Sequence, residues 1–464
     1  MTPQHQRILH VDGDSFFASC EIALDPKLKK LPVFVGGGRR GDGIVIAANY
    51  LAKAYGIITG MACFEAKRKC PDGVLVRPHY DEYRRLSLEI FRRVRYYTPL
   101  LVPTSIDEGF MDFTDSPAVF RCRTPAELIM RMRRELDDEV GVPVSMGLGS
   151  SRWLAKLATE HCKPDNFHEV PEDKEREFLR DVPVQKLAGI AKRRALSLRA
   201  LGIWTLGDVA HLPLGLLEKR YGFFGLELWL LATGQLREQL SLANKPRTCI
   251  GSATTLPYDE PDYETALLFL LDQTERTVTT FFRENLKARE MGVYVRFKNM
   301  EGNGVSVKFP AAQFEPRLIN PQVEQLFWQL VTHETQPIRQ VCINFWNMKP
   351  LELEPDMFNN DVEFKRRELH HAMEEVEARY GKRSVKTGTR LLLEKEAAYL
   401  VGEKAKCPFI PQREMEIKMD NIPEPILDLI YEDEWKPLEG SAPAEPLPLP
   451  RTWGRSTSRT QKFL

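Results

Sequence analysis

The first 165 residues alternate between short apolar runs and longer segments whose apolar residues recur at helical spacing. Residues 7–11 (RILHV) form an apolar run that predicts a buried strand, and residues 81–97 place Leu86, Ile90 and Val94 on one helical face. The same reasoning predicts strand, Gly-rich turn, strand and helix start at 31–60, strand–turn–strand at 103–114, helices at 126–140 and 153–161, and a strand at 142–149. Strands and helices mixed in this way favour an α/β or α+β core.

The pattern changes after residue 166, where short helices separated by glycines predict a small all-helical module up to residue 243. Residues 249–350 follow the order strand, helix, strand, strand, helix, strand, which predicts a separate small α+β domain. One more helical segment is expected at 362–380. From about residue 406 the apolar period is lost, and an acidic stretch followed by Pro-, Ser- and Arg-rich sequence predicts a partly disordered tail.

Charge balance, hydropathy and cysteine spacing exclude several classes of protein. The 65 basic residues are balanced by 65 acidic ones, which excludes a uniformly basic nucleic-acid binder but is compatible with a basic groove offset by acidic sites. No apolar run is long enough for a transmembrane helix, and the polar N-terminus is unlike a signal peptide. The eight cysteines form no C-x-x-C pair, so zinc ribbons and thioredoxin-like sites lack their signature. We therefore expect a cytoplasmic protein without membrane contact.

The sharpest chemical signal is a set of carboxylates at the ends of predicted strands. Asp12 and Asp14 end the first strand, and Asp107 and Glu108 lie in the turn of a later strand pair. Clustered carboxylates at buried strand ends are costly unless a cation neutralises them, and oxygen-only ligands favour Mg²⁺ or Mn²⁺. Two such ions are the usual device of nucleotidyl transfer. The alternative interpretation is that each pair merely begins or caps a turn.

Four motifs in register resemble the Y-family translesion DNA polymerases, in particular the bacterial DNA polymerase IV group and its UmuC-like relatives. They are D-x-D-x-F-F-A-x-x-E at 12–21, A-N-Y at 48–50, S-I-D-E at 105–108 and A-K-x-A-x-x-x-x-K-P at 155–164. The likeness covers residues 6 to about 350. The helical segment followed by GKRSVK resembles the C-terminal segment of UmuC-like chains and extends the likeness to about residue 392.

The resemblance implies a multidomain α+β fold of the right-hand polymerase type. The boundaries it implies are palm 1–23 and 76–165, fingers 24–75, helix-hairpin-helix-like thumb 166–243, α+β little finger 246–350, C-terminal helical segment 351–405 and tail 406–464. It further implies a monomer that adds dNTPs to a primer 3′-hydroxyl on template DNA, by two-metal transfer and with low processivity. A non-catalytic DNA-binding scaffold of the same family and a two-metal nucleotidyl cyclase are the alternatives.

The resemblance also assigns roles at the catalytic centre. Asp12, Asp107 and Glu108 match the family's metal-binding triad, and the backbone carbonyl of Gly13 matches an additional ligand. Two Mg²⁺ ions, with Mn²⁺ as a substitute, are the implied cofactors. Asp14 is the second carboxylate of its motif and is expected to support the site rather than bind metal.

Nucleotide contacts follow from the same motifs. Phe17 matches the steric gate, the aromatic face that collides with a ribose 2′-hydroxyl, and Phe16 beside it is expected in the core at the nucleotide site. Tyr50 and Lys53 lie at i and i+3 of a predicted helix start and match the pair that holds the triphosphate. Lys53 replaces the usual Arg and so loses the bidentate fork. Lys163, before Pro164, matches the remaining phosphate-binding lysine.

DNA and clamp contacts are the least determined assignments. Lys192 and Arg193 follow a helix-hairpin-helix-like turn, and Arg296 and Lys298 lie on a predicted little-finger strand, so all four are expected at DNA phosphates. Family members commonly carry a Gln-plus-apolar peptide that docks on the sliding clamp. Three segments compete for that role: Gln461, Phe463 and Leu464 at the chain end, Met357 and Phe358 after the little finger, and the connector 239–242.

Overall fold

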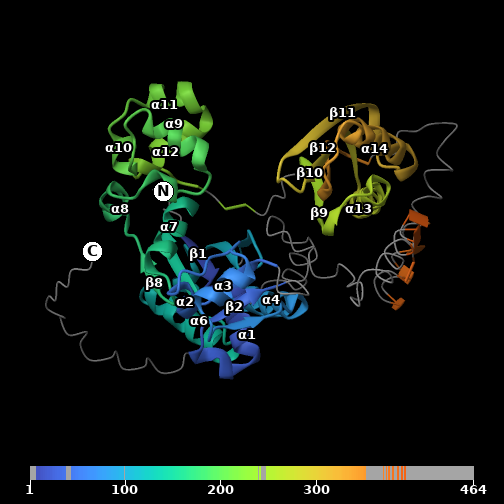
Figure 1. The fold of residues 1–464 in the computed structure, drawn as a ribbon. Helices are drawn as coiled ribbons and strands as arrows, with labels where there is room; N and C mark the ends of the chain where they lie inside the picture. Colours follow the sequence, from blue (N-terminus) through green and yellow to red (C-terminus); the bar gives the residue numbers. More distant parts are fainter. Residues whose placement is uncertain are drawn as a thin grey trace. The chain divides into compact units, whose positions relative to one another are not determined.

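The computed structural model describes residues 7–37, 43–98, 100–238, 240–241 and 247–351, and scattered residues between 369 and 395. These residues divide into two compact units, with the boundary between them at residues 243 and 244 (Figure 1). The expected tail and most of the C-terminal helical segment lie outside the described residues. Across the described part of the chain, no helix combines the length and apolar character needed to cross a bilayer.

A five-stranded sheet is the centre of the first unit. Its strand order is β5–β6–β1–β7–β8, with bounds Leu101–Pro103, Glu108–Asp112, Ile8–Gly13, Val144–Gly149 and Phe167–Glu169. The central strand β1 is buried along its whole length and pairs antiparallel with β6 and β7. Strand β8 pairs parallel with β7, so residues 167–169 belong to this sheet, whereas the glycine-separated pattern alone assigns them to the helical module.

Side chains of β1 alternate between two cores, as a strand's period of two requires. Leu9 and Val11 pack into the main core, which helices α1 (Phe16–Leu24), α4 (Tyr80–Tyr96) and α6 (Pro125–Glu139) complete. Ile8 packs into a smaller cluster with Ala155 of α7 (Arg152–Cys162). His10 and Asp12, which share the period of Ile8, therefore point to the face that α7 covers.

Close backbone packing places α7 against this face. A Cβ on Gly147 of β7 would lie 2.2 Å from the carbonyl oxygen of Ala155 and 2.4 Å from the amide nitrogen of Thr159. Only glycine allows that approach, and the residue brings one side of α7 directly over β1 and β7. Helix α7 begins at a side-chain cap, in which Ser151 accepts a hydrogen bond from the amide of Leu154.

A three-stranded sheet of order β3–β2–β4 forms a smaller layer in the first unit. Its strands are Val45–Ala48, Val33–Gly36 and Val74–Val76, and the associated helices are the 3₁₀ helix η1 (Pro26–Lys30), α2 (Tyr50–Lys53) and α3 (Cys63–Lys69). Phe34, Val45 and Ala52 are among the buried residues of its separate core. The two strands and the helix start predicted for 31–60 are therefore confirmed, whereas most of the predicted Gly-rich turn, at 38–42, lies outside the described residues.

Short helices make up the rest of the first unit up to residue 232. They are α5 (Ser116–Val119), η2 (Glu172–Lys174), α8 (Glu175–Arg180), η3 (Val184–Lys186), α9 (Lys192–Arg199), α10 (Leu206–Ala210), α11 (Leu214–Tyr221) and α12 (Phe223–Ala232). From α8 onward these helices share one core, to which Leu154 and Ala158 of α7 also contribute. The predicted helical module is confirmed for residues 172–232, and it is continuous with α7.

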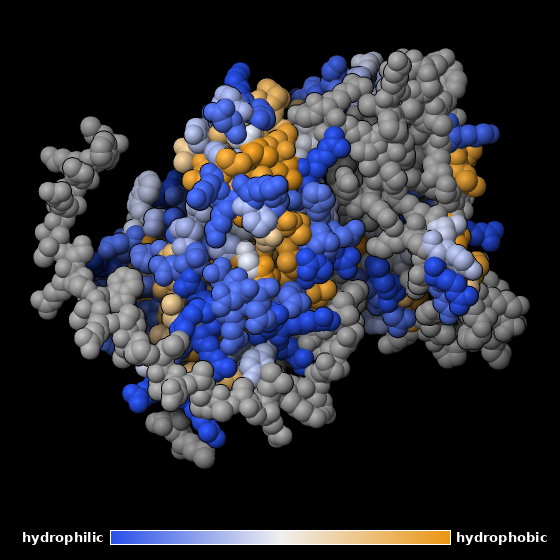
Figure 2. All heavy atoms as spheres, turned by 90° about the horizontal axis from the view of Figure 1, so that it is seen from below, coloured by the Kyte–Doolittle hydropathy of each residue, from blue (hydrophilic) through white to orange (hydrophobic). Residues whose placement is uncertain are grey.

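The second unit confirms the predicted element order. Strands β9 (Cys249–Glu260), β10 (Leu286–Phe297), β11 (Gly302–Gln313) and β12 (Ile338–Pro350) form an antiparallel sheet of order β11–β10–β12–β9, and its helices are α13 (Tyr263–Arg283) and α14 (Pro316–Val331). Both helices and one face of the sheet contribute to a single core. Hydrophilic residues dominate the face of the molecule shown in Figure 2, with apolar residues gathered in a band between them.

Candidate active site

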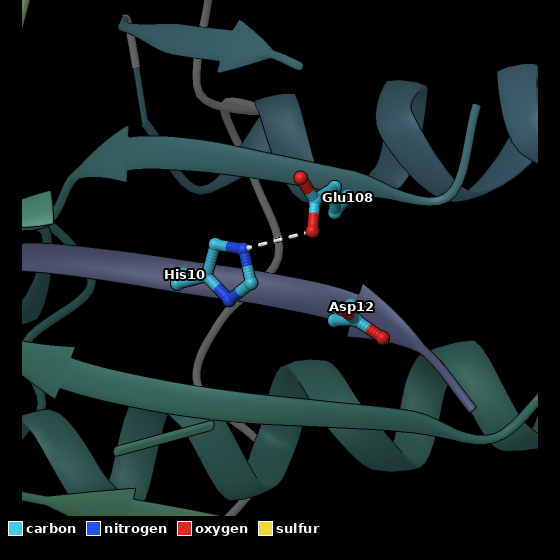
Figure 3. A group of neighbouring side chains, drawn as sticks. All are labelled: His10, Asp12 and Glu108. Atoms are coloured by element: carbon cyan, nitrogen blue, oxygen red, sulfur yellow. Dashed lines mark ion pairs between the residues drawn. The ribbon is translucent and has the colours of Figure 1, made fainter. Parts of the chain in front are cut away.

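Two carboxylates meet across the central strand pair. Asp12 near the end of β1 lies directly opposite Glu108, the first residue of β6, and opposite Ser145 of β7 on its other side. Figure 3 shows His10, Asp12 and Glu108 on the same side of these strands. One ligand atom from each of the three residues lies within 4.8 Å of the others, the one such group of three among the described residues.

His10 is the member of this group that motif reasoning missed. Its side chain is fully buried, its Nδ1 lies 2.9 Å from Oγ1 of Thr159 on α7, and its Nε2 lies 3.7 Å from Oε2 of Glu108. Burial lowers the pKa of the imidazole, which favours the neutral ring. A sequence signal for His10 did exist, because residues i and i+2 of a strand share a face and His10 precedes Asp12 by two.

Asp107 approaches the pair from the turn before β6 but lies outside that group of three. Its carbonyl accepts a hydrogen bond of 2.9 Å from the amide of Gly13, which ties the turn to the end of β1. Ser105 donates its hydroxyl to the Asp107 carboxylate and accepts from the amides of Asp107 and Glu108 at 3.2 and 3.1 Å. A Cβ on Gly13 would lie 2.9 Å from Cδ2 of Phe16, so a side chain there would disturb this turn.

Charge at the site is unevenly compensated. Burial raises the pKa of Asp12 to about 7, although the ammonium of Lys163 lies only 2.8 Å from its Oδ1 and acts in the opposite direction. Burial also raises the pKa of Asp107. The pKa of Glu108 is well below its usual range, first because the His10 ring lies against its carboxylate and stabilises the ionised form. Lys156 acts in the same direction by donating to its Oε2 at 2.6 Å.

These observations fit a divalent cation. Carboxylates held at a desolvation cost are stabilised when a cation binds, and the oxygen ligands that Asp12 and Glu108 bring to this group suit Mg²⁺ or Mn²⁺. Two lysines already supply positive charge at the same strand ends: Lys156 on α7 contacts Glu108, and Lys163 at the C-terminal end of α7 contacts Asp12. Lys156 belongs to the motif at 155–164, yet sequence reasoning gave it no role, because its contact with Glu108 depends on how α7 packs on the sheet.

The Asp14 carboxylate accepts hydrogen bonds from three different parts of the first unit. Its Oδ2 accepts hydrogen bonds of 2.7 Å from the hydroxyl of Ser145 and from the amide of Asp165, and its Oδ1 accepts the Tyr50 hydroxyl at 3.3 Å. The side chain is 2% exposed. Asp14 therefore joins three separate segments: β7, the turn after α7, and α2.

Helix α2 brings Tyr50 and Lys53 together, as their spacing predicts. Asn49 caps the helix by accepting from the amide of Ala52 at 2.9 Å. The Lys53 ammonium lies 4.5 Å from the centre of the Tyr50 ring and donates to the hydroxyl of Ser15 at 2.8 Å. The two side chains thus lie at the loop that follows Asp14.

Phe16 and Phe17, the first two residues of α1, are both buried in the main core. Phe17 stacks on Tyr83 of α4, with ring centres 4.7 Å apart and an angle of 20° between the planes. Phe16 lies beside it, with ring centres 5.8 Å apart. Tyr83 lies in none of the sequence motifs. Its contact with Phe17 depends on the packing of α4 on α1, which the sequence alone does not show.

The residues expected at DNA lie on both units. Lys192 and Arg193 are exposed at the start of α9, while Arg194 donates to the carbonyl of Gly189 at 2.6 Å and lies 4.1 Å from the Phe224 ring centre. Gly189 has a φ of +84°, a conformation that favours glycine and forms the turn before the helix. In the second unit, Arg296 lies on β10 and the exposed Lys298 directly after it.

Of the three candidate clamp-binding segments, the structure describes part of only one. Met357, Phe358, Gln461, Phe463 and Leu464 all lie outside the described residues. Leu240 of the connector candidate is only 8% exposed and packs with Ile8 and Phe110 of the sheet. A leucine held in this way is not available to insert into a partner, which argues against the connector.

Comparisons with known proteins show which families and chains this sequence is similar to. The impB/mucB/samB family model matches residues 11–160, and the model of that family's C-terminal domain matches residues 247–355. Similar proteins include DNA polymerase IV of Caulobacter vibrioides, 36% identical over 54% of this chain and 62% of its own length. DNA polymerase IV of Ralstonia nicotianae is 32% identical over 66% of this chain and 85% of its own length. The chain thus spans less than two thirds of the Caulobacter protein but most of the Ralstonia one.

Solved structures share the fold. A chimaera of the Y-family DNA polymerases Dbh and Dpo4 is 24% identical, with a TM-score of 0.64 over 74% of this chain and 98% of the chimaera. A ternary complex of Dbh gives a TM-score of 0.51 at 24% identity, over 73% of this chain and 98% of Dbh. The fold is therefore that of a Y-family polymerase. With both family models matched in order and relatives aligned over most of their length, the chain belongs to the impB/mucB/samB family of Y-family DNA polymerases, together with bacterial DNA polymerase IV.

Proposed function

We propose that this chain is a template-directed DNA polymerase of the translesion type, which adds dNTPs to a primer 3′-hydroxyl. The observation that carries the proposal is the register that sets Asp12 opposite Glu108 on β1 and β6, with Asp107 tied to Gly13 at the same strand ends. Names of the relatives agree with this activity.

Asp12, Asp107 and Glu108, with the carbonyl of Gly13, would hold two Mg²⁺ ions, and Mn²⁺ would substitute. When bound, such ions neutralise phosphate charge and make the attacking hydroxyl a better nucleophile. His10 and Lys156 contact Glu108 and would fix its orientation. Asp14 would hold the surrounding segments in place without binding metal.

Cationic and aromatic side chains around the carboxylates would bind the incoming nucleotide. Lys163, Lys53 and the Tyr50 hydroxyl would contact the triphosphate, because a polyanion is bound by hydrogen-bond donors and positive charge. Phe17 would exclude ribonucleotides by contact with the sugar, and Phe16 would pack behind the nucleotide site. These roles are carried over from motif positions, and the contacts of α2 with Asp14 and Ser15 are compatible with them.

The remaining assignments describe how DNA is held. The proposed domains are palm (1–23 and 76–165), fingers (24–75), thumb (166–243) and little finger (246–350). Lys192, Arg193, Arg296 and Lys298 would contact the DNA backbone of the primer–template, largely through charge. We expect a monomer of low processivity, so a sliding clamp that tethers it is the expected partner.

A primer-extension assay tests the function. Wild-type protein should extend a primer on plain template in Mg²⁺, and the Asp107→Ala/Glu108→Ala variant should lose about 10³-fold or more of the rate, because several kcal/mol of transition-state stabilisation depend on the ions. Binding of primer–template should be retained. Glu127→Gln, an exposed change on α6, is the matched control. Wild-type protein that binds DNA without extending a primer would instead identify a DNA-binding scaffold.

A further inference from the structure

Glu21 is a buried carboxylate that the proposed chemistry does not use. It lies on α1 one turn after Phe17, at i+4, so both side chains share the face of α1 that meets α4. Glu21 is 3% exposed. A carboxylate buried in this way is tolerated only where donors satisfy it, and both of its donors come from the start of α4.

Tyr83 and His79 are those donors. The Tyr83 hydroxyl donates to Oε1 of Glu21, and Nδ1 of His79 lies 2.9 and 3.1 Å from the two carboxylate oxygens. Tyr83 itself is fully buried, whereas the His79 side chain is 57% exposed. His79 immediately precedes α4, and its carbonyl accepts from the amide of Tyr83 at 3.1 Å. The carboxylate therefore ties the first turn of α4 to α1.

The ring of Tyr83 transmits this tie to Phe17. It stacks on Phe17 with centres 4.7 Å apart, and Tyr80 closes the corner by meeting Phe17 edge-on at 6.1 Å and 89°. Tyr80 and Tyr83 also meet edge-on, at 5.8 Å and 80°. A stacked Tyr that is fixed at its hydroxyl leaves the Phe17 ring little freedom to turn or to move back.

From this geometry we infer that Glu21 is a positioning residue for sugar discrimination, which acts through Tyr83 on the Phe17 ring. The inference rests on the proposed polymerase function and on Phe17 as the residue that meets the sugar. Exclusion by steric contact works only if the excluding ring cannot yield. Without the Glu21 carboxylate, Tyr83 loses its fixed position, and Phe17 can yield to a 2′-hydroxyl.

Single-nucleotide insertion kinetics with matched dNTP and rNTP test the inference. Glu21→Ala should raise the ratio of rNTP to dNTP kcat/KM about tenfold, chiefly through a lower KM for rNTP, while dNTP insertion changes less. Glu21→Gln keeps an oxygen acceptor for Tyr83 and should restore most of the discrimination. Tyr83→Phe keeps the ring but removes the hydroxyl, and should relax discrimination about as much as Glu21→Ala does.

The Phe17→Ala background separates positioning from a general structural effect. If Glu21 acts through Phe17, then Glu21→Ala should add nothing to the relaxation that Phe17→Ala causes, because effects through a shared residue are not additive. Glu82→Gln, which removes the exposed partner of Arg85 on the same helix as Tyr83, is the matched control. If Glu21→Ala fails to fold, Tyr83→Phe and Glu21→Gln still test whether Glu21 positions Phe17 through Tyr83.

The outcomes are distinct. Unchanged discrimination in Glu21→Ala and Tyr83→Phe, a parallel loss of dNTP and rNTP insertion, or additive effects with Phe17→Ala would each overturn the positioning role while leaving the polymerase function intact. Wild-type protein that inserts neither nucleotide would overturn the proposed function, and the inference with it.

Discussion

Lys163, the C-terminal cap of α7, places its ammonium 2.8 Å from Oδ1 of Asp12 at the end of β1. The same ammonium lies 2.6 Å from Oε1 of Glu160, which is much more exposed than Asp12. One lysine therefore links the buried strand β1 to the surface of α7. A nucleotide triphosphate would compete for it with both carboxylates.

Lys163→Met should weaken nucleotide binding more than it slows chemistry. Hydrogen bonds to charged groups contribute about 1.5–3 kcal/mol, so the KM for dNTP should rise about tenfold or more. Steady-state insertion kinetics at saturating primer–template check this. Glu160→Gln removes only the exposed partner and should change KM less than about twofold, and an equal effect of the two changes would contradict a phosphate role for Lys163.

Asp14→Ala should destabilise the first unit. The change leaves the Ser145 hydroxyl and the Asp165 amide without the acceptor they have at 2.7 Å, at a buried position where each missing partner costs about 1–3 kcal/mol. Urea denaturation followed by tryptophan fluorescence measures the loss. Asp25→Ala, which removes a surface cap of η1, should cost only about 1 kcal/mol. Equal losses in both variants would show that Asp14 does not join these segments.

Glu175 gives the helical module a predictable pH dependence. Burial raises its pKa although Arg237 lies 3.4 Å away, so the folded state holds the proton more tightly than the unfolded state. A raised carboxyl pKa contributes stability that is fully present below the unfolded value and is lost as pH rises through the folded value. Glu175→Gln lacks this loss and should unfold at a higher temperature than wild type at neutral pH.

Thermal melts between pH 4 and 8 check that prediction. The Glu175→Gln and wild-type midpoints should converge at the acidic end and separate as pH rises. Glu177→Gln, on the same helix with an exposed pair to Lys174, should follow the wild-type curve. A constant difference in melting temperature between Glu175→Gln and wild type across this pH range would refute a raised pKa of the Glu175 carboxyl.

The sequence was sufficient to predict structural features that depend on neighbouring residues. Asp12, Asp107 and Glu108 stand out because carboxylates follow apolar runs, and the element order of the second unit follows from period alone. Tyr50 and Lys53 share a face because i and i+3 always do on a helix. In each case the information lies within a few residues.

Contacts between distant elements were beyond sequence reasoning. The bond from Lys156 to Glu108 depends on the close approach of α7 to Gly147, and the Phe17–Tyr83 stack depends on how α4 crosses α1. The three residues of β8 were missed because a strand so short carries no period, and parallel pairing with β7 alone defines it. His10 could have been predicted in part. Its position two residues before Asp12 on a strand places both side chains on one face, but it lies within an apolar run that suggests only a buried strand.

DNA affinity should be largely electrostatic, with a share from the start of α9. The Lys192→Gln/Arg193→Gln variant should weaken primer–template binding and reduce the slope of log affinity against log salt by about 2, one for each phosphate that is no longer neutralised. Fluorescence anisotropy over a range of salt concentrations measures both quantities. Lys174→Gln, an exposed lysine paired with Glu177, should leave the slope unchanged. A slope unaffected by the double change would remove α9 from the DNA interface.

Clamp binding should depend on a segment that follows residue 351. Leu240 is packed against Ile8 and Phe110, so the connector would have to leave its core to engage a clamp. Two candidates are then left, residues 459–464 and the pair Met357 and Phe358. A flexible tether converts weak peptide affinity into a high effective concentration, so loss of the right segment should remove clamp stimulation while leaving unassisted synthesis unchanged.

Deleting residues 459–464 and, separately, changing Met357 and Phe358 to Ala should therefore give one variant that clamp no longer stimulates on long primed templates. The unaffected variant serves as the control for the other, because both retain the catalytic carboxylates. Leu240→Ala leaves a cavity in the sheet and should cost about 2–4 kcal/mol of stability without a selective loss of stimulation. Full stimulation of both tail variants, with a selective loss in Leu240→Ala, would restore the connector as the docking peptide.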